Sequence, residues 1–178
     1  MYQNKILYGF SDIYVCRDNE IPIPIKGAIS IEINIENEVE YARLGGVPSI
    51  SFNINNEGNG QMEILGLNKS EQVLLLGYKE DSNGGLVVSN ATSPMLHLLF
   101  SRKCADGSKQ LYHVYNVRFS NKSLNASTIV EGSIDADNMI LDFDVIYNKD
   151  YGYYYTLNSN DNPTVANNWF NQLQYPNM

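Results

Sequence analysis

The stretch Met95–Phe119, MLHLLFSRKCADGSKQLYHVYNVRF, decides the fold, because it places two strand-like runs around one turn. Asp106-Gly107 at its centre suits a two-residue type I′ turn between antiparallel strands. In the register that this turn sets, His97 and His113 fall on opposite faces of the hairpin. One face is mostly apolar and the other is mixed, which predicts a sheet that is partly covered on both sides.

Other segments before this hairpin alternate apolar and polar residues, the pattern of a half-buried strand. Ile29–Glu36 places its isoleucines on one face and its polar residues on the other. Ile50–Asn55 repeats the pattern and predicts a second hairpin with Gln61–Leu65. The intervening residues are dense in turn formers, so Gly58-Asn59-Gly60 is interpreted as part of a turn.

Two more strands and two helices follow from the remaining patterns. Strands are expected at Met139–Tyr147 and Tyr151–Leu157, joined by Asn148-Lys149-Asp150, with Asp142 and Asp144 on the outer face of the first strand. Asn68–Gly77 has a capping residue, a glutamate in its first turn and a terminal glycine, as an amphipathic helix does. A short helix is expected from Asn162 to about Leu173, with Pro163 at its first position.

Together these elements predict a mainly β protein: an antiparallel β-sandwich or barrel with one flanking helix and a short C-terminal helix. The 178 residues match the size of one domain, 1–178. Lys and Arg total 12 against 20 Asp and Glu, a net charge of −8, which argues against a protein that grips nucleic acid through its phosphates. No apolar run approaches the roughly 20 residues of a membrane span, and the first residues do not have the pattern of a signal peptide.

The sequence offers little catalytic chemistry. The two histidines cannot share a metal ion or substrate if they lie on opposite faces, and Cys104 lies too far along the strand to pair with His97. Cys16 and Cys104 are interpreted as buried free thiols. We therefore expect no enzyme, no cofactor and no metal site. Glu131, Asp135 and Asp137 leave a weak calcium site open, although solvated loop carboxylates explain them better.

Aromatic residues near the C-terminus suggest contact surfaces. Tyrosine is favoured in interfaces, so Tyr153 and Tyr155 are proposed subunit contacts, with packing over the core as an equal alternative. Trp169 lies on the apolar stripe of the last predicted helix, which favours core packing over sugar stacking.

A series of short motifs runs in order along nearly the whole chain. They are Lys5–Phe10 (KILYGF), Pro22–Ile31 (PIPIKGAISI), Tyr41-Ala42, Asp81–Val87 (DSNGGLV), Leu98–Phe100 (LLF), Tyr112–Val117 (YHVYNV), Asn167–Phe170 (NNWF) and Tyr175-Pro176. In this order they resemble the phi13-like family of siphophage major tail proteins, the subunits of the non-contractile tail tube. The stretch 149–160 is longer and richer in Tyr and Asn than the family pattern.

The resemblance implies a tail-tube domain with an N-terminal arm of about residues 1–10 and a C-terminal segment of about 160–178. Six copies are expected to close into a ring by sheet pairing across subunits, and rings to stack into a hollow tube in the virion, built in the bacterial cytoplasm. Its partners would be itself and the tape-measure, tail-terminator and tail-tip proteins. Double-stranded DNA would pass through the lumen without specific binding, and no membrane is involved.

The acidic balance and one polar segment agree with that expectation. A duplex carries one negative charge per about 1.7 Å of its axis, so an acidic lining lets DNA slide without holding it. The polar segment from Glu36 to Pro48 can span at most about 40 Å, enough to reach a neighbouring ring. We expect it to be an inter-ring contact loop, with the contact residues Glu36, Glu38, Glu40, Tyr41 and Arg43.

The main alternative is a stand-alone carbohydrate- or protein-binding β-sandwich of a phage tail tip. In that case Trp169 and the Tyr151–Tyr155 cluster would form the binding platform. A small hydrolase is the interpretation that the sequence favours least.

Overall fold

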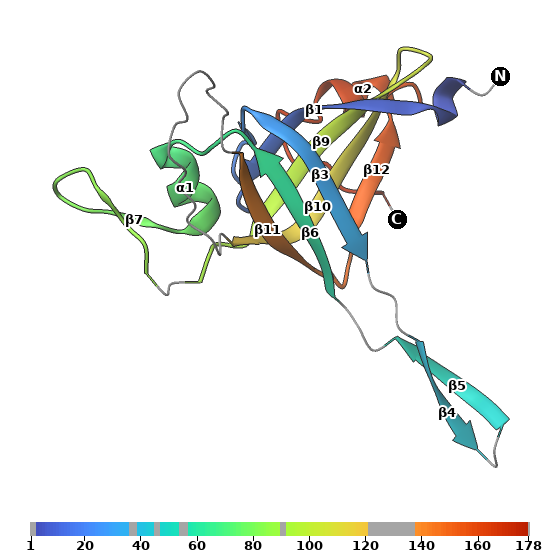
Figure 1. Cartoon of the computed structure of the whole chain (residues 1–178). Coiled ribbons are helices and arrows are strands. Elements are labelled where there is room, and N and C mark those ends of the chain that lie inside the picture. Colours follow the sequence, from blue (N-terminus) through green and yellow to red (C-terminus); the bar gives the residue numbers. More distant parts are fainter. Residues whose placement is uncertain are drawn as a thin grey trace, which may run out of the picture.

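The structure is a computed structural model that describes residues 3–35, 39–44, 47–53, 57–89, 92–120 and 138–177, with only the backbone described for 39–44, 47–53 and Asn4. Strands make up 51% of it and helices 11%. Eight strands form one antiparallel sheet in the order β2-β1-β9-β10-β11-β6-β3, with β12 also paired to β10 (Figure 1). The mainly β, antiparallel prediction is confirmed, but the sheet is not closed into a barrel.

The hairpin at the centre of this sheet consists of β9 (Leu96–Cys104) and β10 (Lys109–Ser120). Its loop has three residues rather than two, because the Cys104 amide donates to the Ser108 carbonyl at 2.8 Å and Gly107 adopts the left-handed φ of 87°. This is the turn with a G1 bulge that three-residue hairpin loops commonly form. The extra residue shifts the pairing by one position, so Lys103 lies opposite Lys109.

The one-residue shift corrects the prediction for the histidines. Moving a strand by one residue exchanges its two faces, so His97 and His113 lie on the same face of the hairpin. Their rings are hydrogen-bonded to each other, with His113 Nε2 and His97 Nδ1 2.9 Å apart. The expectation that both faces are covered is confirmed, because Leu96 through Ser101 are all buried.

The predicted hairpin between residues 50–55 and 61–65 is wrong. β6 (Glu57–Ile64) instead pairs with β3 (Ala28–Ile35) and β11 (Met139–Ile146), and its strand includes Gly58-Asn59-Gly60, which is therefore not a turn. β4 (Val39–Leu44) and β5 (Val47–Asn53) pair with each other in a separate hairpin. That hairpin points away from the large sheet (Figure 1).

Gly58 and Gly60 belong in a strand because their neighbours occupy the space of a side chain. A Cβ atom on Gly60 would lie 2.3 Å from Cζ of Phe143 and 2.4 Å from the Glu32 carbonyl oxygen. Phe143 is the cross-strand partner of Gly60, so its ring covers the glycine and supplies the apolar surface that the glycine lacks.

The last two strands share one edge of β10. β11 pairs with residues 117–120 of β10, and β12 (Tyr154–Asn158) pairs with residues 110–114. A turn closed by the Asn148–Gly152 bridge separates the two strands. The predicted strand at 139–147 is confirmed, with Asp142 and Asp144 more exposed than the buried residues between and beside them. The second strand begins three residues later than predicted.

Two helices flank the sheet. α1 (Lys69–Leu76) confirms the helix predicted at 68–77: the Asn68 side chain and Glu71 form a capping box, and Gly77 ends the helix at a φ of 70°. α2 (Pro163–Asn167) begins at the predicted residue and ends about six residues early, and the chain continues in turns beyond it. Short elements complete the description: β1 (Leu7–Cys16), β2 (Ile23–Pro24), the β7–β8 pair (Lys79–Glu80, Leu86–Val87) and a 3₁₀ turn at Gln3–Lys5.

The sheet has a hydrophobic core on each face. The larger core lies inside its curve and includes α1 through Leu75 and Leu76. The smaller core lies on the other face, where Trp169 and the turns after α2 pack on Cys16, Leu99 and Leu111. Core packing of Trp169 is confirmed, and Cys16 and Cys104 are buried free thiols as predicted. None of the helices in the described ranges has the length and apolar character needed to span a membrane.

The close approach at Gly60 gives a stability prediction. Gly60→Ala should lower the free energy of unfolding by about 2–3 kcal/mol, because Phe143 and the backbone of β3 must move to admit a methyl group. Gly66→Ala is the matched control, since nothing lies within 4 Å of its Cβ position. Urea denaturation of both variants measures the difference. Equal stabilities would show that the Phe143–Gly60 contact does not constrain the fold.

Candidate functional site

The sheet is open, and among the described strands unpaired edges lie at both ends of its order, at β2 and at β3. β3 ends the strand order, and among the described strands it pairs with β6 alone. A groove of about 560 Å³ lies beside it, between the inner face of β3 and that of β1, β9 and β10. The groove is lined by Gly9, Phe10, Ile29, Ser30, Ile31, Ile33, Ile35, Phe100, Arg102, Tyr112, Val114 and Tyr154.

Most side chains that line the groove are apolar, but Ser30 and Arg102 also line it and its exposed surface is as polar as it is apolar. Ile31, Ile33 and Ile35 on β3 are only half-buried. Ile29 is 44% exposed and Tyr154 is 47% exposed. The pairing of β3 with β6 shifts at a bulge between Ala28 and Ser30, and Ile29 at this bulge lines the groove together with Ile31. Exposed apolar side chains gathered in this way mark an interaction site in a soluble protein.

The projecting hairpin contains part of the predicted inter-ring loop. Glu40, Tyr41 and Arg43 lie on β4, where Glu40 pairs with Phe52 and Tyr41 with Ser51. Glu36 and Glu38 lie outside the described residues, so their role in the loop stays a prediction. The hairpin extends outward from the ends of β3 and β6 (Figure 1). Because a two-stranded hairpin alone is marginally stable in water, it gains from contact with another surface.

The predicted tyrosine contacts are partly used within the chain. Tyr155 packs on Trp169 with ring centroids 5.4 Å apart, and Tyr153 packs edge-to-face on Tyr147 at 5.2 Å. Both are half-buried, whereas Tyr154 between them is exposed and faces the groove. The arrangement agrees with the packing alternative for Tyr153 and Tyr155, and it identifies Tyr154 as the tyrosine that a partner can reach.

A second groove, of about 470 Å³, lies over β3, β6 and β11 and is polar. Glu32, Asp142 and Asp144 contribute three carboxyl groups, and no lysine or arginine lines it. The Gln61 side-chain amide donates to Asp142 at 3.0 Å. The part of the chain that the structure describes holds no cluster of three or more metal-ligating side chains. Glu131, Asp135 and Asp137 lie outside that part.

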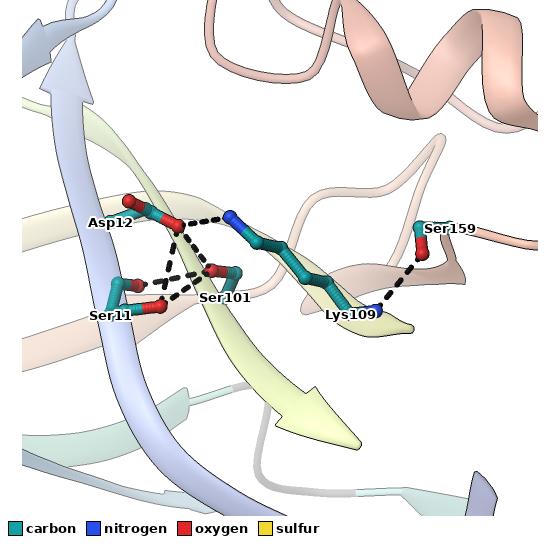
Figure 2. A network of polar contacts seen from close by, with 5 residues as sticks. All are labelled: Ser11, Asp12, Ser101, Lys109 and Ser159. Atoms are coloured by element: carbon teal, nitrogen blue, oxygen red, sulfur yellow. Dashed lines mark hydrogen bonds and ion pairs between the residues drawn. The ribbon is translucent and has the colours of Figure 1, made fainter. Parts of the chain in front are cut away.

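A polar network connects β1 to the central hairpin (Figure 2). The Asp12 carboxylate accepts hydrogen bonds from the Ser101 hydroxyl at 2.9 Å and the Lys109 ammonium at 2.6 Å. The Ser11 hydroxyl lies 3.2 Å from that of Ser101, and the Lys109 amide donates to Ser159 at 2.9 Å. Asp12 has a φ of 54° at a bulge in β1. The network therefore stabilises an irregular strand.

The same network does not have the form of a catalytic centre. A nucleophilic serine needs a base that can take its proton, but Asp12 is already paired with Lys109. Partial burial raises the pKa of Asp12, yet the hydrogen bonds from Lys109 and Ser101 and the Lys109 charge outweigh it, so this pKa lies below its usual value. A carboxylate held in this way is a weak base.

The second polar cluster is the histidine pair, which sequence reasoning missed because it assumed a two-residue turn. His97 and His113 are buried, and they lie between Asp18 and the C-terminal residues Gln174 and Tyr175. The alternation along the two strands would have placed both histidines on one face of the hairpin if the loop had been known to contain three residues.

Comparison with known proteins assigns no family to this arrangement. No protein-family model matches the chain, and no curated protein matches it.

The Asp12 network predicts a pH-dependent contribution to stability. Because the pKa of Asp12 is depressed in the folded chain, its ion pair stabilises the fold above the ordinary carboxyl pKa of 3.8 and is lost as the pH falls below it. Asp12→Asn should thus destabilise by up to about 1 kcal/mol at pH 7 and by less at pH 3. Asp150→Asn, in an exposed turn, is the charge-matched control. Urea midpoints that differ equally at both pH values would contradict this role.

Proposed function

We propose that this protein is the structural subunit of a phage tail tube, in which copies of the chain close into hexameric rings and the rings stack. The observation that carries the proposal is the unpaired edge of β3 beside a groove that mostly apolar side chains line. The order of motifs along the sequence gives the tail-tube form of assembly, the number of copies and the expected location in the virion.

The free edge supports self-association through strand pairing. An unpaired edge presents backbone N–H and C=O groups to any extended segment, and monomeric proteins usually block such edges with lysine, proline or a covering loop. The β3 sequence AISIEINI contains neither lysine nor proline, and its half-buried isoleucines face the groove. A strand added at this edge would satisfy the backbone and cover apolar surface at once.

The β4–β5 hairpin supports contact between successive rings. It is six to seven residues long on each strand, so it extends about 20 Å from the sheet. A surface patch that contacts a different patch on the next copy gives an open-ended assembly, as a stacked tube requires. Glu36 and Glu38 remain proposed contact residues with Glu40, Tyr41 and Arg43.

The charge of the chain supports a conduit that does not hold DNA. Each copy carries a net charge of −8, and the described lining of the polar groove holds Glu32, Asp142 and Asp144, with Arg118 of β10 opposite Asp144 as the neighbouring cation. Such a surface repels the phosphate backbone. The tape-measure, terminator and tip proteins remain the expected partners at the ends of the tube.

The alternative function, a binding module of a tail tip, retains only part of the aromatic binding surface that it requires. Trp169 is fully buried and cannot stack on a sugar ring. The exposed Tyr147, Tyr151 and Tyr154 remain available. This alternative predicts a persistent monomer that binds glycans on an array.

The groove generates the central test of self-assembly. Negative-stain electron microscopy of the concentrated protein should show rings or tubes. Ile29→Lys should reduce their yield at least about tenfold, because a charge in the groove must be desolvated by a docked strand. Ile140→Lys is the matched control, since Ile140 is 56% exposed on β11 and lies outside the groove. A wild-type protein that stays monomeric, or equal yields from both variants, would contradict the proposal.

The acidic residues of the proposed inter-ring segment, Glu36, Glu38 and Glu40, give a separate test of stacking. Replacing Glu36, Glu38 and Glu40 together with lysine should shorten the tubes while the melting temperature changes by less than about 3 °C, because surface charges contribute little to folding. Tube length measured by electron microscopy decides the matter. Tubes of unchanged length and yield would remove this segment from the inter-ring contact.

A further inference from the structure

A chain of three hydrogen bonds crosses the outer face of the central hairpin. Asp18 Oδ1 lies 2.6 Å from His97 Nε2, His97 Nδ1 lies 2.9 Å from His113 Nε2, and His113 Nδ1 lies 2.8 Å from the Gln174 carbonyl oxygen. Both imidazoles are buried, whereas the Asp18 side chain is 79% exposed. The chain thus runs from solvent to the C-terminal segment.

Counting donors places the protons of the two bonds that His113 makes. The Gln174 carbonyl can only accept, so His113 Nδ1 carries a proton. One further proton lies between His113 Nε2 and His97 Nδ1. At the His97–His113 contact one ring nitrogen must donate and the other accept, so this bond requires that one of the two rings lacks a proton there.

The last bond of this chain holds residues 174–177 on the sheet. Next to Gln174, the Tyr175 ring stacks on Tyr115 at an interplanar angle of 3° and packs on Tyr151 with centroids 4.7 Å apart. It also meets the His113 ring edge-to-face at 5.6 Å. The segment is attached through the imidazole pair, these rings and the Gln174 side-chain amide, which donates to the Asn168 carbonyl at 3.4 Å.

We propose that His97 and His113 form an acid-opened latch for the C-terminal residues 174–177. When both rings are doubly protonated, N–H faces N–H at the His97–His113 contact, where no acceptor remains. The two imidazolium rings then repel each other inside a buried site, and release of Gln174 and Tyr175 admits water to solvate them. This device does not depend on the proposed function.

The surroundings of the pair agree with opening in acid. Burial lowers the pKa of His113 to about 4, with the Gln174 bond opposing this shift and the charge of His97 adding to it. When the segment is released, His113 regains a pKa near its ordinary 6.5, so the open form binds more protons between these values. Opening is therefore favoured progressively as the pH falls from about 6.5 to about 4.

Other ionisable groups surround the pair. They come from β1 and the residues after it, from β10, from the 147–153 turn, from β12 and from the C-terminal segment: Cys16, Asp18, Glu20, Tyr115, Tyr151, Tyr155 and Tyr175.

Hydrogen exchange of the full chain tests the latch. The protected amides beside the segment are those of Asn171 and Gln172, which donate to the Asn168 carbonyl that also accepts from the Gln174 side chain. After correction for intrinsic rates, their protection, read from peptides covering 168–177, should fall at least about tenfold between pH 7 and pH 4.5. Peptides of β9 and β10 should stay protected, which separates opening from global unfolding. His113→Gln should abolish the change, because a neutral amide donates to Gln174 and accepts from His97 at every pH. Unchanged wild-type protection, or the same loss in the variant, would overturn the proposal.

A second measurement keeps the test independent of the variant's folding. Nitrogen-15 NMR of labelled histidine in the wild-type chain should show His113 as the neutral Nδ1–H tautomer at pH 7. The His113 signals should change with a midpoint near pH 4. A His113 that is charged at pH 6 would overturn the latch.

Discussion

The left-handed turn at Gly107 is the constraint on which the rest of the structure depends. It sets a three-residue loop, and this loop fixes which side chains of β9 and β10 share a face. Leu98, Phe100 and Val114 consequently face the core that contains α1. Leu99 and Leu111 face the core that Trp169 closes. A loop shorter by one residue would exchange these sets on one strand and place apolar side chains beside polar ones.

Local patterns in the sequence predicted the elements better than their pairing. The cap of α1, the alternation around Asp142 and the burial of Trp169 all follow from short-range chemistry, and all are found. The partner of β5 does not follow, because Ile50–Asn53 alternates equally well whichever strand it meets. The glycines of β6 look like a turn until Phe143, which is 83 residues away in the chain, is seen to cover Gly60.

The candidate surfaces were harder to predict, since each is assembled from distant segments. The groove combines Phe10 of β1 with Ile33 of β3 and Tyr112 of β10, which only the curvature of the sheet brings together. Its apolar residues are the ones that sequence analysis assigns to an ordinary core. They differ from core residues only because no described strand pairs with the outer edge of β3, and the sequence pattern of β3 does not indicate this. The histidine pair likewise depends on one residue of loop length.

The pairing of β1 with β9 has a consequence for folding kinetics. Ser11 and Ser101 lie 90 residues apart in sequence and yet share a hydrogen bond at 3.2 Å. Contacts over such separations form slowly, because the entropic cost of closing a long loop comes before the contacts that stabilise the closed form. The hairpin of β9 and β10 can form early from local contacts, whereas the first strand must wait for it as a template. We therefore expect the first strand to pair late in folding, and until it does its exposed backbone can pair with other copies and aggregate.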